Sequence, residues 1–199
     1  MRRPLISVIG DGSLEENSPK EIFAFELGKA LVDNGYRIVS GGLGGVMKAA
    51  FRGAHSSEKY REGDTVAILP GNNPVDANEF ADIVIATGLD AARNFIVANS
   101  DAVVAVGGGC GTLSELSYAW ALKRLILAYR VPNCSAEQNC FSDWSLLSAD
   151  KKLDDKVRYE NISDDRIYGV DSADEAVRIL NEKLPLYNER PKSAGNRRA

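Results

Sequence analysis

Seven short apolar runs alternate with amphipathic segments along the chain. They lie at residues 5–9, 36–39, 65–69, 83–86, 102–106, 125–128 and 166–170. Short runs rich in β-branched side chains are typical of buried strands. Because helical segments separate them, the pattern predicts an α/β fold with a single doubly wound, mostly parallel sheet and helices on both faces, in the Rossmann-like arrangement.

Capping residues and apolar spacing predict the helices between these strands. Ser18-Pro19-Lys20-Glu21 combines an N-cap serine, a proline at the first helical position and a capping-box glutamate, and Asn34-Gly35 ends the helix that follows. Four more helices are expected, at residues 46–53, 90–99, 112–123 and 172–184. Residues 132–165 lack a clear period, and we expect an irregular segment there.

Three of the predicted strands run into glycine clusters, at residues 10–13, 41–45 and 107–111. Parallel α/β sheets bind ligands outside the carboxyl ends of their strands, where the strand order reverses, so we expect the three loops to line one pocket. Glycine lets the backbone approach a ligand closely, and a helix N-terminus presents free N–H groups to phosphate. The residues predicted to hold a phosphate-bearing ligand are Gly10, Gly12, Ser13, Gly41, Gly42, Gly44, Gly45, Val46, Met47, Gly108, Gly109, Gly111 and Thr112.

Two charged residues accompany these loops. Arg93 lies near the start of the helix after the fourth strand, and its guanidinium can make a charge-assisted contact with phosphate. Glu115 lies one turn into the helix that Thr112 is expected to open. It either forms a capping box with Thr112 or acts on the ligand as a carboxylate, and the residues alone leave both interpretations open.

Length and composition describe a protein with one domain. The 199 residues predict a single unit over residues 1–188, and we expect the polar, basic segment 189–199 to be a disordered tail. The hydrophobic fraction of 44% is ordinary for a soluble globular protein. The net charge of −4 argues against a nucleic-acid partner, and the lack of a long apolar run or a signal peptide argues against a membrane partner.

Cysteine usage and motif patterns exclude several other classes. Cys110, Cys134 and Cys140 form no paired framework and have no metal-binding spacing with the single histidine, His55. We therefore expect a reduced, cytoplasmic protein without a metal site, in which Cys110 is a small buried side chain. None of the glycine loops carries the G-x-G-x-x-G or G-x-x-x-x-G-K-[ST] pattern, so a nicotinamide dehydrogenase and an ATPase are both disfavoured.

Residues 108–115 read Gly-Gly-Cys-Gly-Thr-Leu-Ser-Glu and resemble the P-G-G-x-G-T-x-x-E signature of the lysine decarboxylase-like superfamily. This superfamily includes the Lonely Guy phosphoribohydrolases and the molybdenum cofactor carrier proteins. Residues 41–47 resemble its second glycine motif, and Ala92-Arg93-Asn94 resembles its arginine segment. The resemblance spans residues 6–127, with the motifs in the same order.

Four positions depart from the hydrolase branch of that superfamily. Gly107 replaces the signature proline, and Cys110 stands where the hydrolases usually have tyrosine. Ser114 replaces the first of two paired glutamates, and Asn94 replaces the lysine after the arginine. The chain is therefore more similar to the cofactor-carrier-like branch. That resemblance implies binding of a phosphate-bearing, molybdopterin-type cofactor without turnover, and no other cofactor is expected to be required.

The hydrolase branch supplies the alternative function. It implies a nucleoside 5′-monophosphate as ligand, with Arg93 and Glu115 as the catalytic pair that cleaves its N-glycosidic bond. A third interpretation, from another class, is a nucleotide-sensing subunit that works with partner proteins. In all three cases a small phosphate-bearing ligand is the expected partner, and the sequence leaves open whether Glu115 acts chemically.

The predicted helix at residues 112–123 is unusually apolar. Tyr118 and Trp120 follow Glu115 on it, among small and aliphatic side chains. A helix that is apolar all round is either buried or part of an interface. We therefore expect a homodimer or higher homo-oligomer, with Tyr118 or Trp120 near the interface.

Overall fold

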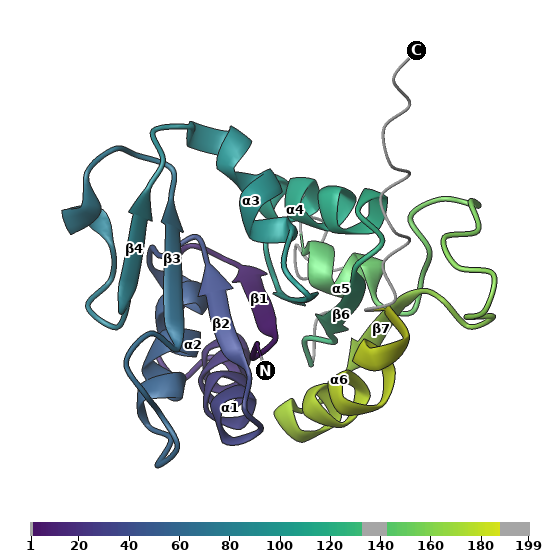
Figure 1. Ribbon diagram of the computed structural model, residues 1–199, viewed down its shortest axis with the longest axis horizontal. Helices are drawn as coiled ribbons and strands as arrows, with labels where there is room; N and C mark the ends of the chain where they lie inside the picture. Colours follow the sequence, from purple (N-terminus) through teal and green to yellow (C-terminus); the bar gives the residue numbers. More distant parts are fainter. Residues whose placement is uncertain (1, 133–142, 188–199) are drawn as a thin grey trace.

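The computed structural model describes residues 2–132 and 143–187 (Figure 1). Its strands are β1 (Leu5–Gly10), β2 (Arg37–Ser40), β3 (Thr65–Leu69), β4 (Ile83–Ala86), β5 (Ala102–Val106), β6 (Leu125–Tyr129) and β7 (Ile167–Val170). They form one seven-stranded sheet in the order β4-β3-β2-β1-β5-β6-β7, and every neighbouring pair is parallel. The predicted α/β fold is confirmed. The predicted tail, Cys134 and Cys140 lie outside the described residues.

The helices connect the strands on both faces of the sheet. They are α1 (Pro19–Asp33), α2 (Gly45–His55), α3 (Asn94–Ala98), α4 (Cys110–Ala121), α5 (Trp144–Ser148) and α6 (Ala173–Tyr187), with short 3₁₀ turns η1 (Pro74–Asp76) and η2 (Asp90–Arg93). Figure 1 shows α1, α2 and α6 on one side of the sheet and α3 and α4 on the other. Among the described residues, no helix is both long and apolar enough to cross a bilayer.

Alternation along the central strands divides the core between the two faces. In β1, Ile6 and Val8 pack with α1, α2 and α6, whereas Ile9 packs with α3 and α4. Successive side chains of a strand point to opposite faces, so a strand that is covered on both faces is apolar at almost every position. This is why the short apolar runs of the sequence correspond to strands.

Three helical segments differ from the sequence prediction. The expected helix at residues 90–99 is η2 followed by the short α3, and its expected first residue, Asp90, has a φ of +50°, outside the α-helical region. Helix α4 begins two residues earlier than expected, because Gly109 is its N-cap. Helix α5 was not predicted, since five residues are too few to show a 3.6-residue period. Its N-cap is Asp143, whose carboxylate accepts a hydrogen bond from the Leu146 N–H at 3.1 Å.

The strand order reverses between β1 and β5. From β1 the chain adds β2, β3 and β4 on one side, and it then returns to add β5, β6 and β7 on the other. At this point Gly10 ends β1 close to β5, and a Cβ at Gly10 would lie 2.0 Å from the Val106 carbonyl oxygen. The carboxyl ends of β1 and β5 therefore form the crevice where doubly wound sheets place their ligands.

Candidate functional site

The three glycine-rich loops line one cleft of about 290 Å³ at the carboxyl ends of β1, β2 and β5. The predicted site residues that line it are Gly10, Gly12, Gly41, Met47, Arg93, Gly109, Gly111, Thr112 and Glu115. Ile9, Asp11 and Leu43 complete the lining. The other predicted residues lie in the same loops or at the start of α2 but are not part of the lining, and these are Ser13, Gly42, Gly44, Gly45, Val46 and Gly108.

The first turn of α4 supplies free backbone donors at the cleft. The Leu113 N–H donates to the Gly109 carbonyl at 3.0 Å, but the amides of Cys110, Gly111 and Thr112 have no hydrogen-bond partner within the described part of the chain. A helix N-terminus leaves such donors unpaired and carries a partial positive charge. Because Gly111 and Thr112 line the cleft, its wall contains the positive end of α4.

The start of α2, in contrast, is closed by the first glycine loop. The Val46 N–H donates to the Asp11 carbonyl oxygen at 2.9 Å, and the Gly42 N–H donates to Ser40 Oγ at 3.1 Å. Gly45, with a φ of +57°, allows this approach, because a Cβ there would lie 2.1 Å from the same carbonyl oxygen. Two of the amides predicted to hold the ligand are thus already hydrogen-bonded within the chain.

Arg93 and Glu115 meet at the cleft. Arg93 Nη1 donates to Glu115 Oε1 at 3.0 Å, and the two side chains are 12% and 8% exposed. The guanidinium lies against Gly41, where a Cβ would be 2.6 Å from Nη2. Arg93 Nε is buried and has no hydrogen-bond partner within the described residues. The second glycine loop therefore makes room for a buried guanidinium that retains an unused donor.

The environment of Glu115 favours its protonated form. Burial raises the pKa of the Glu115 carboxyl to about 7, against the lowering effect of the Arg93 charge and hydrogen bond. The capping-box interpretation of Glu115 was wrong, since the N-cap of α4 is Gly109 and it makes no side-chain cap. The earlier start of the helix places Glu115 well inside it, on the side that contacts Arg93.

Two of the departures from the hydrolase branch contact each other. Asn94 Nδ2 donates to Ser114 Oγ at 2.7 Å, and Ser114 Oγ donates to the Gly111 carbonyl at 2.7 Å. Asn94 is buried. These bonds tie the start of α3 to the first turn of α4, beside the ion pair of the cleft. The lysine and glutamate of the hydrolases are therefore replaced here by a neutral hydrogen-bonded pair.

An ion-pair network that sequence reasoning missed lies beside the first loop. Lys20 Nζ is 2.8 Å from Asp11 Oδ2 and 2.7 Å from Asp143 Oδ2. Burial opposes the charge of Lys20, but its interactions with both carboxylates raise its pKa overall. These residues come from the loop after β1, from α1 and from the N-cap of α5, so no local pattern in the sequence could have indicated the network.

Cys110 is exposed at the first position of α4, so the expectation of a buried side chain was wrong. The buried residues of α4 form one stripe and are Thr112, Glu115, Leu116, Ala119 and Trp120. At 100° per residue, Cys110 lies on the opposite side of the helix from this stripe. No group of three or more His, Cys, Asp and Glu side chains that could hold a metal ion occurs within residues 2–132 and 143–187.

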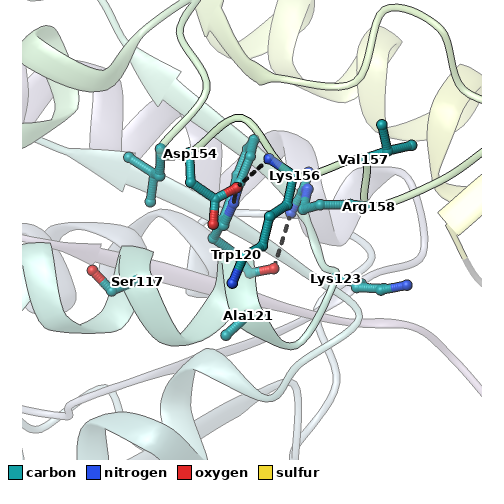
Figure 2. Close-up of a pocket in the computed structure, with 9 residues that line it drawn as sticks. Ser117, Trp120, Ala121, Lys123, Asp154, Lys156, Val157 and Arg158 are labelled. Carbon is teal, nitrogen blue, oxygen red and sulfur yellow. Dashed lines mark hydrogen bonds between the residues drawn. The ribbon is translucent and has the colours of Figure 1, made fainter.

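A larger hollow of about 480 Å³ lies at the other end of α4 (Figure 2). The Arg158 guanidinium stacks on the Trp120 ring, 3.6 Å from its centroid, and Trp120 Nε1 donates to Asp154 Oδ1 at 3.1 Å. Trp120 is therefore covered within the chain and is not available to an interface. Tyr118 is 40% exposed and remains the candidate interface residue of the two that were predicted.

The model of the SLOG cluster4 family matches residues 3–160, a range that contains all three glycine loops and the ion pair of the cleft. The chain belongs to the SLOG cluster4 family. This SLOG cluster4 protein is 39% identical to an uncharacterized protein of Archaeoglobus fulgidus over 133 residues, which are 66% of this chain and 83% of the relative.

Two solved structures resemble this SLOG cluster4 protein over almost their whole length. The molybdenum cofactor binding protein of Rippkaea orientalis is 28% identical with a TM-score of 0.71, and the similarity covers 92% of this chain and 99% of that one. The molybdenum cofactor carrier protein of Chlamydomonas reinhardtii is 27% identical with a TM-score of 0.67, and the same shares are covered. The predicted place in the lysine decarboxylase-like superfamily, on the cofactor-carrier-like side, is confirmed.

Proposed function

We propose that this protein binds a phosphate-bearing nucleotide or pterin-type cofactor in the glycine-loop cleft and holds it without turnover, as a molybdenum cofactor carrier does. The observation that supports the proposal is the convergence of three glycine-rich strand ends on one cleft that contains the N-terminus of α4. The names of the two similar solved structures support the same class of ligand.

In this proposal the phosphate group takes the free donors of the cleft. The amides of Gly111 and Thr112 hold it at the positive end of α4, and Arg93 adds a charge-assisted contact through the part of its guanidinium that Glu115 does not use. The glycine-rich loops let the backbone approach the ligand closely, as glycine-rich phosphate sites do. Because Ser114 replaces one glutamate and the other is paired with Arg93, little charge remains for chemistry on the ligand.

A second function, phosphoribohydrolase activity, is favoured by one observation. The Glu115 carboxyl lies at the cleft wall, and its Oε1 is 3.0 Å from Arg93 Nη1. A carboxylate at this place could stabilise a cationic sugar. In that case incubation with GMP would release guanine and ribose 5-phosphate, and Glu115→Gln would slow release by about 10²–10³-fold. We expect no base release by the wild-type protein over hours, measured by liquid chromatography.

The binding proposal is tested by blocking the cleft while leaving the fold intact. Gly109 has a φ of −94° and a Cβ there would contact nothing, so Gly109→Val is expected to fold normally and to fill the mouth of the cleft. Calorimetric titration with inorganic phosphate and with GMP should show binding to the wild type and loss of both in this variant. Gly71→Val, outside the cleft, is the matched control, because a Cβ there would make only an ordinary contact of 3.5 Å with Asp76 Oδ2. Equal affinity in Gly109→Val and wild type would overturn the proposal.

We also propose that two copies associate through α3 and α4. Phe95, Ile96 and Tyr118 are 43%, 44% and 40% exposed, and the rings of Phe95 and Tyr118 pack edge to face with centroids 5.4 Å apart. Large apolar side chains gathered on one surface support an interface. The interface of the predicted homodimer would then contain Tyr118 and two residues of α3, Phe95 and Ile96.

A further inference from the structure

Asp11 contributes the one carboxylate of the first glycine loop to the cleft. Its side chain is 29% exposed and lines the cleft, while its backbone carbonyl accepts the Val46 N–H. One carboxylate oxygen, Oδ2, is held by Lys20 Nζ at 2.8 Å. The other has no hydrogen-bond partner within the described residues. Asp11 is thus oriented by Lys20 and keeps an unused acceptor.

The third glycine loop is shaped around this carboxylate. A Cβ at Gly107 would lie 2.2 Å from Asp11 Oδ2 and 2.8 Å from Lys20 Nζ. Gly107 also has a φ of +69°, which proline cannot adopt. The Asp11–Lys20 pair therefore requires glycine at position 107 in place of the signature proline, since a larger residue there would displace the pair.

The charge balance decides what Asp11 can contact. Lys20 is shared between Asp11 and Asp143, so the three groups together are negative. An ionised carboxylate only accepts hydrogen bonds, and it repels phosphate. The phosphate group therefore belongs at the N-terminus of α4, and a donor-bearing part of the ligand belongs at Asp11.

We propose that Asp11 is a specificity residue of this cleft, which accepts a hydrogen bond from a hydroxyl or amino group carried by the phosphate-bearing ligand. This inference rests on the proposed function. It separates two contributions to affinity: α4 binds the phosphate, and Asp11 selects ligands that also carry a donor. Lys20 acts as a positioning residue, because it holds Asp11 through Oδ2.

The test compares ligands that share a phosphate and differ in donors. Calorimetry would be run on the full chain with inorganic phosphate, GMP, 2′,3′-dideoxy-GMP, which lacks the ribose hydroxyls, and IMP, which lacks the amino group of guanine. Wild type should bind GMP at least tenfold more tightly than phosphate. If wild type binds GMP and the dideoxy compound equally well, the donor is on the base. If wild type binds GMP and IMP equally well, the donor is on the ribose.

Asp11→Ala should weaken GMP binding by about 10- to 100-fold, the usual effect of losing a hydrogen bond to a charged group, and leave phosphate binding unchanged. Asp143→Asn is the matched control, because it alters the other carboxylate on Lys20 outside the cleft, and it should keep the wild-type preference. Unfolding curves of all variants would check that they fold.

Each remaining outcome gives a decision. If wild type binds phosphate but Asp11→Ala keeps the full preference for GMP, the role of Asp11 is refuted and the phosphate site stands. If Asp11→Ala and Asp143→Asn weaken GMP and phosphate equally, the network is only structural and the inference is overturned. If wild type binds neither phosphate nor GMP, the proposed function fails, and this inference fails with it.

Discussion

The buried Glu115 carboxyl should make the stability of the protein fall as the pH rises, and Glu115→Gln should remove this dependence. Glu115 is 6% exposed and receives its one hydrogen bond in the described structure from Arg93. Its pKa is raised from 4.5 to about 7 by burial. The folded state therefore binds a proton at Glu115 more tightly than the unfolded chain does. This contribution to stability is fully present below about pH 4.5 and is lost as the pH rises through about 7.

The size of the effect follows from the shift. Moving a pKa from 4.5 to about 7 corresponds to about 3 kcal/mol in the free energy of unfolding. Between pH 5 and 8.5, wild type should therefore lose about 2–3 kcal/mol relative to Glu115→Gln, whose amide stays neutral over this range. Arg93 remains charged in both proteins, so the cost of burying its guanidinium cancels in the comparison.

Urea unfolding followed by circular dichroism at five pH values between 5 and 8.5 gives the free energies of unfolding. The quantity that decides is the difference between wild type and Glu115→Gln as a function of pH. A constant difference would show that Glu115 titrates alike in the folded and unfolded chain. A wild type that gains stability relative to Glu115→Gln as the pH rises would show that the Arg93 ion pair outweighs burial. Either result would refute the reasoning.

Two further predictions concern other parts of the molecule. Arg158→Met should lower the free energy of unfolding by roughly 3–5 kcal/mol, because it leaves the Asp165 carboxylate buried without its ion-pair partner. Arg178→Met removes an arginine from exposed ion pairs and should change the free energy of unfolding by less than about 1 kcal/mol in the same urea experiment. Equal effects of the two substitutions would contradict the greater importance of the buried pair. Phe95→Asp should convert the proposed dimer to a monomer by light scattering, whereas Val75→Asp, 80% exposed on η1, should leave it unchanged; monomeric wild type would contradict the interface.

The strands and the main ligand loops could be predicted because their causes are local. A strand covered on both faces, such as β5, must be apolar throughout. Helix α1 begins at Pro19, directly after the Ser18 cap, and this start is visible within four residues. The glycines after β1, β2 and β5 are equally visible. Since parallel strands place their carboxyl ends at one edge of the sheet, the sequence also predicted that these loops meet.

Features that depend on contacts between distant segments were missed or misassigned. Helix α5 is too short to show a period, and Asp143 reaches Lys20 only in the folded chain. Cys110 was expected to be buried, but it is the first residue of α4 and lies on the exposed side of that helix. The same early start excluded the capping-box interpretation, one of the two that the sequence left open for Glu115. The start of a helix depends on the backbone of the loop before it, which no local motif revealed here.

The sequence by itself determined the sheet, its helical connections and the three loops that meet at the strand-order reversal, because apolar alternation, caps and glycines act over a few neighbouring residues. Only the tertiary structure decided which charges face each other in the cleft. Arg93 reaches Glu115 because Gly41 leaves space for its guanidinium, and Lys20 orients Asp11 because Gly107 has no side chain. Such pairings depend on the positions of whole elements packed against one another, so they exist only once the sheet and its helices have assembled.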